Sequence, residues 1–348
     1  MNNLTTVGVD LAKDVIQVCV FSNNKVLSNS EMTPSEFTCW LTTHKHSIVV
    51  FEACGTSNYW KQKATILGHD ARLISAKLVG TVRQNQKTDK NDALAIVQAS
   101  MLPDVQFISG KSLEQQQLQS ILRMRELSVK QKTALNNQLS ALLLEFNIRV
   151  SPRSGGLKGA IFSFLEDAEN GLTMIFRQAI EQMWLQYLSK VELIQKFDEY
   201  LRGLLDSISQ CKKLTKLEGV GVINAVNLYL TFNSEELSVF TSGKNAAACI
   251  GLTPLQYSSG GKTKLGSIGK HVKNSILRSQ LVTGAFTYVN QVGRRPARSQ
   301  KDVWLQALIK RRGKKCAAVA LANKTVRTAF AMLNNKTEYV AAKLEHAA

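Results

Sequence analysis

Apolar and polar positions in the first hundred residues vary with the short period that is typical of strands, interrupted twice by helical spacing. In chain order, the pattern predicts two strands within 5–21, a strand at 25–30, a helix from 33, a strand at 47–52, a helix at 59–67, a strand at 71–75 and a helix from about 89. Within the run 47–52, the residues between Ser47 and Glu52 are continuously apolar, which suits a central strand covered on both faces. The sequence therefore predicts an α/β domain in the order βββαβαβα.

Between residues 113 and 214 the apolar spacing lengthens to that of helices. One apolar stripe runs along 113–148 beneath a remainder rich in Gln, Lys and Arg, and a second helical stretch runs from 172 to 214. The segment 151–156, made of Ser, Pro, Arg and Gly, separates them. Two long helices joined by such a break predict an antiparallel hairpin or coiled-coil arm, which would dimerise, grip nucleic acid or act as a spacer packed on itself.

The remaining residues predict a mainly α-helical region. Helices are expected near 240–252, around Ile276 to Val282, and after the basic run 310–315. Gly219 and Gly221 form a Gly-x-Gly turn between two predicted helices. This turn resembles the helix-hairpin-helix element, whose amides and following helix N-terminus can hold a phosphate. A lone Gly-x-Gly is a weak signal, and an ordinary interhelical turn is a serious alternative.

The segment 257–271 is dense in Gly, Ser and Lys. On composition alone, it favours a flexible surface linker. The same residue types could instead bring amides and ammonium groups against a phosphate while presenting a hydroxyl. The lysines of this segment are Lys262, Lys264 and Lys270.

Charge is distributed unevenly along the 348 residues. The net charge is +18, but residues 1–110 are close to neutral, with ten Lys and Arg against nine Asp and Glu. From residue 262 onward there are eighteen Lys and Arg against three Asp and Glu. A basic surface concentrated in this way predicts a polyanionic partner, nucleic acid first, through residues such as Arg278, Arg311 and Arg312.

Other features exclude several classes of protein. No apolar run approaches the length of a membrane span, so we expect no membrane partner. The six cysteines are scattered without a C-x-x-C pair, and the five histidines form no ligand constellation, which makes a zinc site improbable and indicates a reducing compartment.

Four acids fall at the ends of predicted elements: Asp10, Glu52, Asp89 and Asp92. Asp89 and Asp92 are three apart at a helix start, so both carboxylates leave one face of its first turn. Carboxylates at strand ends facing such a pair would make an all-oxygen site for Mg²⁺ or Mn²⁺ and favour metal-assisted attack on phosphodiesters.

The alternative is that Asp89 caps the helix with Asp92 as its partner. That alternative leaves Asp10 unexplained, since a carboxylate buried in an apolar strand is costly unless it is paired or metal-bound. The element order, with acids at these places, is that of a ribonuclease H-like domain.

The chain as a whole resembles the transposases of the insertion-sequence family numbered 110, in its 1111 branch, and the related Piv-type invertases. The motifs that carry this resemblance are VGVDLAK (7–13), FEACGT (51–56), KTDKNDA (87–93), LEGVGVINA (217–225), GLTPLQYSSGGKTKLG (251–266) and KKCAAVALANK (314–324). The resemblance implies a RuvC-like catalytic domain over 1–110, a coiled-coil insertion over 111–212 and a basic transposase domain over 213–348.

The resemblance also implies a mechanism and partners. Asp10, Glu52, Asp89 and Asp92 would be the catalytic tetrad that binds Mg²⁺, and Ser259 the nucleophile that forms a covalent phosphoserine, with Ser258 as an adjacent rival. It further implies donor and target DNA as partners and a structured bridge RNA as guide. The protein would act as a homodimer or homotetramer, in the bacterial cytoplasm at the nucleoid.

Two departures and two rival functions stand beside this expectation. The segment 268–274 and the triplet 322–324 differ from the usual family pattern, which predicts weakened activity if those residues bind the scissile strand. The rivals are a metal-dependent Holliday-junction nuclease that uses water as nucleophile, and a nucleic-acid-binding protein without catalysis.

Overall fold

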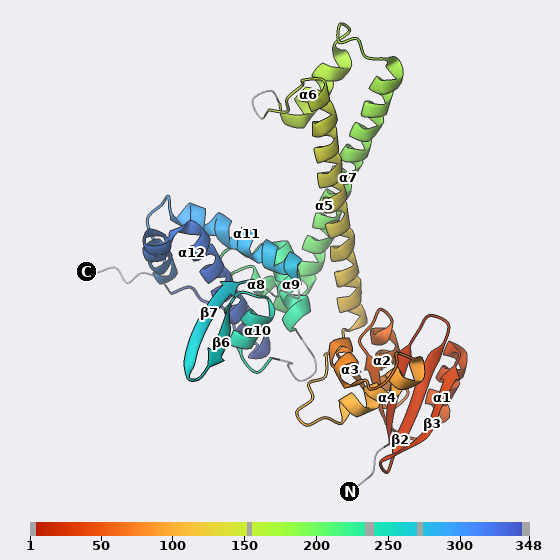
Figure 1. The fold of residues 1–348 in the computed structure, drawn as a ribbon. Helices are drawn as coiled ribbons and strands as arrows, with labels where there is room; N and C mark the ends of the chain where they lie inside the picture. Colours follow the sequence, from red (N-terminus) through yellow and green to blue (C-terminus); the bar gives the residue numbers. More distant parts are fainter. Residues whose placement is uncertain (1–4, 152–154, 234–239, 270–273, 343–348) are drawn as a thin grey trace, which may run out of the picture. The chain divides into compact units, whose positions relative to one another are not determined.

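The computed structural model describes residues 5–151, 155–233, 240–269 and 274–342 (Figure 1). The chain divides into two compact units, one made of Met1–Gln116 with Thr231–Ala246, the other of Gln117–Leu230 with Ala247–Ala348. The three-domain division stays a prediction. No helix among the described residues is both long and apolar enough to cross a membrane.

The first unit contains a five-stranded mixed sheet. Its strands are β1 (Thr6–Leu11), β2 (Ile16–Ser22), β3 (Lys25–Met32), β4 (Ile48–Glu52) and β5 (Asp70–Ile74). They lie in the order β3-β2-β1-β4-β5, with β1 antiparallel to β2 and parallel to β4. The predicted strands are confirmed, and the arrangement is consistent with a nuclease-like α/β domain.

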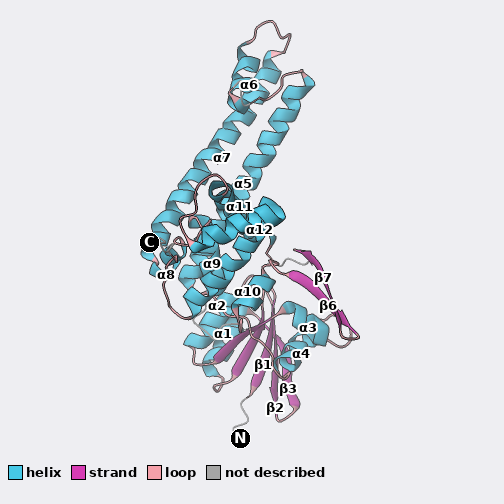
Figure 2. Cartoon of the chain, turned by 90° about the vertical axis from the view of Figure 1, so that its left-hand side faces the viewer, coloured by secondary structure: helices cyan, strands magenta, loops and turns pink. Residues whose placement is uncertain are grey.

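Helices cover both faces of this sheet (Figure 2). On one face, α1 (Pro34–Thr43) and α2 (Ser57–Ile66) close a core that includes Phe37, Phe51 and Trp60. On the other face lie α3 (Ala76–Val82) and α4 (Asp89–Ser100), with Ile96 packed against Val50 of β4. The side chains of each strand therefore alternate between the α1–α2 face and the α4 face.

A glycine on β1 sets how closely α4 approaches the sheet. A Cβ at Gly8 would lie 2.3 Å from the carbonyl oxygen of Ala93 and 2.7 Å from Cγ2 of Val97. No side chain fits in that space, so the backbone of α4 crosses β1 at Gly8. Because α4 begins four residues before Ala93, this contact also fixes where its first turn lies relative to β1.

The second unit has two long helices, and both were expected. They are α5 (Leu113–Glu145) and α7 (Met174–Ser207), which run side by side in both views (Figures 1 and 2). Arg125 on α5 pairs with Asp198 on α7, with 2.5 Å between Nε and Oδ1. These contacts describe a helical hairpin; a coiled coil is not confirmed.

A helix missing from the prediction lies between the two. The break expected at 151–156 is followed by α6 (Gly156–Glu166), and residues 152–154 lie outside the described part of the chain. Ile161 and Phe164 of α6 pack with Leu139 and Trp184 of the long helices. The second stretch is helical up to residue 214, as expected, but Ile208 leaves helical geometry and divides it into α7 and α8 (Ser209–Leu214).

The segment 257–271 corrects the expectation of a flexible linker. Most of it belongs to an antiparallel hairpin of β6 (Pro254–Ser259) and β7 (Lys262–Ile268). Gly260 and Gly261, with φ of 55° and 78°, form its two-residue turn. Glycines at both central positions are what a tight hairpin turn of this kind requires, and composition alone hid this signal.

The remaining helices are α9 (Val222–Phe232), α10 (Gly243–Cys249), α11 (Ser275–Val292) and α12 (Gln300–Asn334). The basic run 310–315, which was expected to lead into a final helix, spans the point inside α12 where two helical segments meet. Gly313, with φ 80° and ψ 167°, interrupts α12 there, and Lys324 comes back to lie 4.9 Å from the ring of Trp304. The second half of α12 therefore folds back along the first.

Candidate active site and nucleic-acid interface

Strand register brings two of the four acids together. In the parallel pair β1–β4, Val9 lies opposite Phe51, so Asp10 and Glu52 come level one residue further along. Val9 and Phe51 face α1 and α2. Because successive side chains alternate, Asp10 and Glu52 project from the α4 face.

The first turn of α4 carries the other two acids to the same face. Asp89 is its first residue, and Asp92 is buried at 6% exposure. The N-cap is Thr88, whose side chain accepts a hydrogen bond from the Asn91 N–H. The alternative in which Asp89 caps the helix is therefore wrong.

The electrostatics show that the four carboxylates interact. Burial, followed by the charges of Asp92, Glu52 and Asp89, raises the pKa of Asp10 to about 6. Burial and the charge of Asp92 likewise raise the pKa of Glu52 above its ordinary value. Like charges held this close disfavour ionisation unless a cation joins them.

Two cations from the chain already offset this charge, and the sequence did not single them out. Arg83, at the end of α3, donates from Nη1 to Oδ1 of Asp92 at 2.8 Å. The charges of Lys87 and Arg83 both lower the pKa of Glu52. The sequence pattern did not indicate a role for Arg83, because only the packing of α3 beside α4 brings it to Asp92.

The donor set suits a hard divalent cation. Carboxylate oxygens are the ligands that Mg²⁺ and Mn²⁺ prefer, and a buried amide oxygen on the same face, Oε1 of Gln17, has no hydrogen-bond partner in the structure. Among the described residues, no group of three or more His, Cys, Asp or Glu is already arranged around a common metal position. The chemistry of the donor oxygens therefore fits such an ion.

The candidate serine lies in the second unit, at the tip of the β6–β7 hairpin. Ser259 pairs with Lys262 across the turn, and Tyr257 pairs with Lys264. Residues opposite each other, and those two apart, share a face, so Ser259, Lys262 and Lys264 lie on one face of the hairpin. Ser258 pairs with Thr263 on the other face. All four of these positions are exposed.

The Gly-x-Gly turn borders a pocket of about 330 Å³. A Cβ at Gly284 of α11 would lie 2.2 Å from the Gly219 carbonyl oxygen, so α11 packs directly on the turn. The lining consists of Arg125, Gly221, Val222, Ile223, Asn224, Ser279, Gln280 and Thr283. The amide hydrogens of the first turn of α9 have no intrahelical acceptor, so the pocket combines such donors with a guanidinium and two hydroxyls.

The other predicted contacts with nucleic acid have varied surroundings. Arg311 and Arg312 are exposed at the Gly313 interruption. Arg278 is partly committed within the protein, since its Nε donates to the Gly251 carbonyl at 3.2 Å. Lys270 lies outside the described residues.

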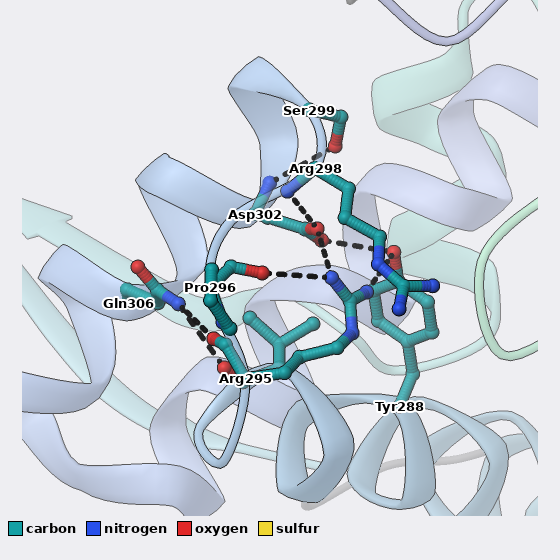
Figure 3. Close-up of polar contacts among 8 residues, drawn as sticks. Tyr288, Arg295, Pro296, Arg298, Ser299, Asp302 and Gln306 are labelled. Atoms are coloured by element: carbon teal, nitrogen blue, oxygen red, sulfur yellow. Dashed lines mark hydrogen bonds and ion pairs between the residues drawn. The ribbon is translucent and has the colours of Figure 1, made fainter. Parts of the chain in front are cut away.

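A buried acid between α11 and α12 was not anticipated (Figure 3). Asp302, at 1% exposure, accepts hydrogen bonds from the hydroxyl of Tyr288 at 2.9 Å, from Nη1 of Arg295 at 2.8 Å and from the Arg298 N–H at 2.9 Å. Burial alone would raise the pKa of Asp302, but these hydrogen bonds hold the pKa below its ordinary value. Arg295 is therefore a structural cation of the 294–298 basic segment.

Comparison with known proteins gives matches in both units of the chain. A transposase profile of the DEDD type, described as "Transposase" and named for IS110, matches residues 7–148, and one described as "Transposase IS116/IS110/IS902 family" matches residues 211–301. The transposase for insertion sequence element IS1111A of Coxiella burnetii is 32% identical over 340 residues, which cover 97% of this chain and 92% of that protein.

More distant relatives extend the same picture. The probable family 20 transposase of Pseudomonas aeruginosa is 31% identical, over 97% of this chain and 99% of that protein. The pilin gene-inverting protein of Moraxella bovis is 22% identical, over 96% of this chain and 97% of that protein. With two transposases aligned over nearly their whole length, and with both profiles matched in order, this chain belongs to the IS110 family of transposases.

Proposed function

We propose that this transposase cuts and rejoins DNA strands with a RuvC-like acidic site in its first unit and a serine nucleophile in its second. The observation that supports this most is the convergence of four acids on the α4 face of the sheet, where burial and the charges of the other three raise the pKa of Asp10 to about 6. Carboxylates held close together lower the stability of the metal-free protein, and such perturbed groups are typical of functional sites.

Asp10, Glu52, Asp89 and Asp92 hold a divalent cation, Mg²⁺ or Mn²⁺, in this proposal. Such an ion supplies Lewis-acid polarisation of a phosphate oxygen. Arg83 and Lys87 keep the acids together before the ion arrives, because their charges offset the mutual repulsion of the carboxylates.

Ser259 is the nucleophile. Its hydroxyl oxygen attacks the phosphorus of the scissile phosphodiester and forms a bond to the 5′-phosphate, while the bond from phosphorus to the 3′ oxygen breaks. The proton lost by the serine is balanced by the proton that the leaving oxygen takes up, which releases a 3′-hydroxyl end. A 3′-hydroxyl from the other DNA then attacks the same phosphorus and displaces the serine, so strands are rejoined without another energy source. Lys262 and Lys264, on the hairpin face of Ser259, offset the negative charge that develops on the phosphate oxygens.

The pocket beside Gly219 and Gly221 binds a backbone phosphate through helix amides and Arg125, without reading sequence. Arg311 and Arg312 on α12 add further phosphate contacts, and Arg278 on α11 and Lys270 contribute others. The family resemblance adds two expectations to this proposal. A structured bridge RNA acts as guide, and a dimer or tetramer brings the acids and the serine to one phosphate.

The test is covalent capture. Full-length protein is incubated with its element's noncoding RNA, Mg²⁺ and labelled DNA carrying the element's ends, then denatured and resolved on a gel. We expect a protein–DNA adduct for the wild type and for Ser258→Ala, and none for Ser259→Ala. An adduct that persists in Ser259→Ala would refute the assignment of Ser259.

The rival functions give other outcomes of the same experiment. Cleavage without adduct in both serine variants would indicate a nuclease that uses water, as in junction resolution. DNA binding without cleavage, unchanged by Asp10→Asn, would indicate a binding protein. The proposed recombinase instead loses cleavage in Asp10→Asn while it retains DNA binding.

A further inference from the structure

Gln17 on β2 is a buried polar side chain that the acid site does not yet explain. It is 1% exposed, and its Nε2 donates to Oδ1 of Asn29 on β3 at 2.7 Å. Asn29 in turn donates from Nδ2 to the carbonyl oxygen of Lys90 at 3.0 Å. Since Lys90 lies between Asp89 and Asp92, this relay ties two strands to the turn that carries half of the acids.

The relay fixes which way the Gln17 amide points. The Lys90 carbonyl can only accept, so the nitrogen of Asn29 faces it and the oxygen of Asn29 faces Gln17. Gln17 must then present its nitrogen to Asn29, which turns Oε1 the other way. That oxygen is buried and has no hydrogen-bond partner among the residues that the structure describes.

Strand register places the Gln17 side chain beside Asp10. Gln17 lies directly opposite Asp10 in the antiparallel pair β1–β2. Opposite residues share a face, and Cys19, two residues on, packs against Ala93 and Val97 of α4, so the Gln17 side chain lies on the α4 face beside Asp10. An ionised carboxylate donates no hydrogen bond, so Asp10 in that state cannot satisfy Oε1.

We propose that Gln17 is a positioning residue of the acid site that contributes a neutral oxygen acceptor toward a hydrated divalent cation. This inference rests on the proposed function, in which the four acids hold the cation. A buried acceptor without a donor is destabilising, and a cation with its water shell provides the missing donors. The relay through Asn29 keeps the amide from rotating away.

The test is Mn²⁺ binding to the full-length protein, measured by titration calorimetry and by electron paramagnetic resonance of free Mn²⁺. Gln17→Met keeps the shape and removes both the acceptor and the donor, whereas Gln17→Glu keeps the acceptor and removes the donor. We expect Mn²⁺ affinity to fall about tenfold in Gln17→Met and to be retained or increased in Gln17→Glu, since lost supporting groups weaken metal sites by this order.

Two controls keep the outcomes distinct. Gln62 on α2 is a part-buried amide on the opposite face, where its Nε2 donates to the Lys111 carbonyl at 2.7 Å, and Gln62→Met should bind Mn²⁺ like the wild type. Asp10→Asn tests the acid site itself. If Asp10→Asn also leaves Mn²⁺ binding unchanged, the proposed function fails, and the inference fails with it.

The inference alone is overturned if Asp10→Asn loses Mn²⁺ while Gln17→Met binds as tightly as the wild type. It is equally overturned if Gln17→Met and Gln17→Glu weaken binding alike, because both lose the donor to Asn29 and a purely structural role would then suffice. Should Gln17→Met not fold, the Glu variant decides: retained affinity supports the role, and a tenfold loss overturns it.

Discussion

Asp10 illustrates at residue scale what the acid site costs the apoprotein. Its pKa of about 6 lies above the ordinary value of an aspartate, so the folded state disfavours the charged form that predominates at neutral pH. Stability from this group is fully present below pH 4 and is lost as pH rises through 6. The site is partly open to water, which limits the effect to about 1 kcal/mol.

Asp10→Asn should therefore stabilise the protein in the absence of divalent ions at pH 7.5, by about 1 kcal/mol, because it removes one of four like charges. Urea unfolding followed by circular dichroism measures this change. The gain should shrink at pH 4.5, where Asp10 is protonated in the wild type. A variant less stable than the wild type at both pH values would contradict the electrostatic account.

Asp302 behaves in the opposite sense. Its pKa is held below the ordinary value, so its stabilisation is present above pH 4 and is lost as pH falls through the lowered value. Asp302→Asn should cost about 3 kcal/mol at pH 7, because it leaves Arg295 without its buried partner. The loss should fade in acid. Thermal unfolding across pH 3 to 7 checks this, and a pH-independent loss would argue for a packing defect.

At the scale of elements, the approach of α4 to β1 positions the acids. Gly8→Ala places a Cβ against the Ala93 carbonyl, which must displace the helix that carries Asp89 and Asp92. We expect a loss of about 2 kcal/mol and weaker Mn²⁺ binding. Gly55→Ala is the matched control, since a Cβ there meets nothing within 4 Å. Equal behaviour of the two variants would contradict the role of Gly8.

The β6–β7 hairpin offers a second test of an element. Its turn needs positive φ at Gly260, which asparagine tolerates and valine does not. Gly260→Asn should retain covalent capture of DNA by Ser259, whereas Gly260→Val should lose most of it at equal DNA binding. The adduct gel measures both. Equal adduct yields would show that the hairpin does not position the serine.

Sequence periodicity predicted elements well where one pattern repeats over many residues. The strands and the two long helices carried such patterns. Helix α6 was missed because its apolar residues, Leu157, Ala160, Ile161 and Phe164, directly follow a run of Ser, Pro and Gly that dominated the interpretation. The hairpin was missed because composition outweighed the Gly260–Gly261 turn signal.

The candidate site also contains residues that the sequence predicted and residues that it did not. Asp10, Glu52, Asp89 and Asp92 were predictable because acids at element ends stand out from apolar runs. Gln17 and Arg83 were not predictable, because their relation to the acids depends on the β1–β2 register and on the packing of α3. Neither is encoded in local spacing.

At the scale of the whole molecule, membership of the IS110 family covers both the acid-bearing region and the basic region of the chain. Its transposase profiles match the acid-bearing unit and the region of the Gly-x-Gly turn and the β6–β7 hairpin. In the proposed function, the acids of the first unit hold a cation, and the basic residues from 262 onward contact DNA phosphates. The central claim is that four separate acids serve one ion.

Mn²⁺ titration of the full-length protein tests that claim most directly, with Asp10→Asn, Glu52→Gln, Asp89→Asn and Asp92→Asn compared against the wild type under identical conditions. Asp70→Asn, which changes an acid paired with Arg72 on β5, is the control. The account predicts that each of the four variants binds Mn²⁺ at least tenfold more weakly while the control binds normally. Wild-type affinity in all four would contradict it.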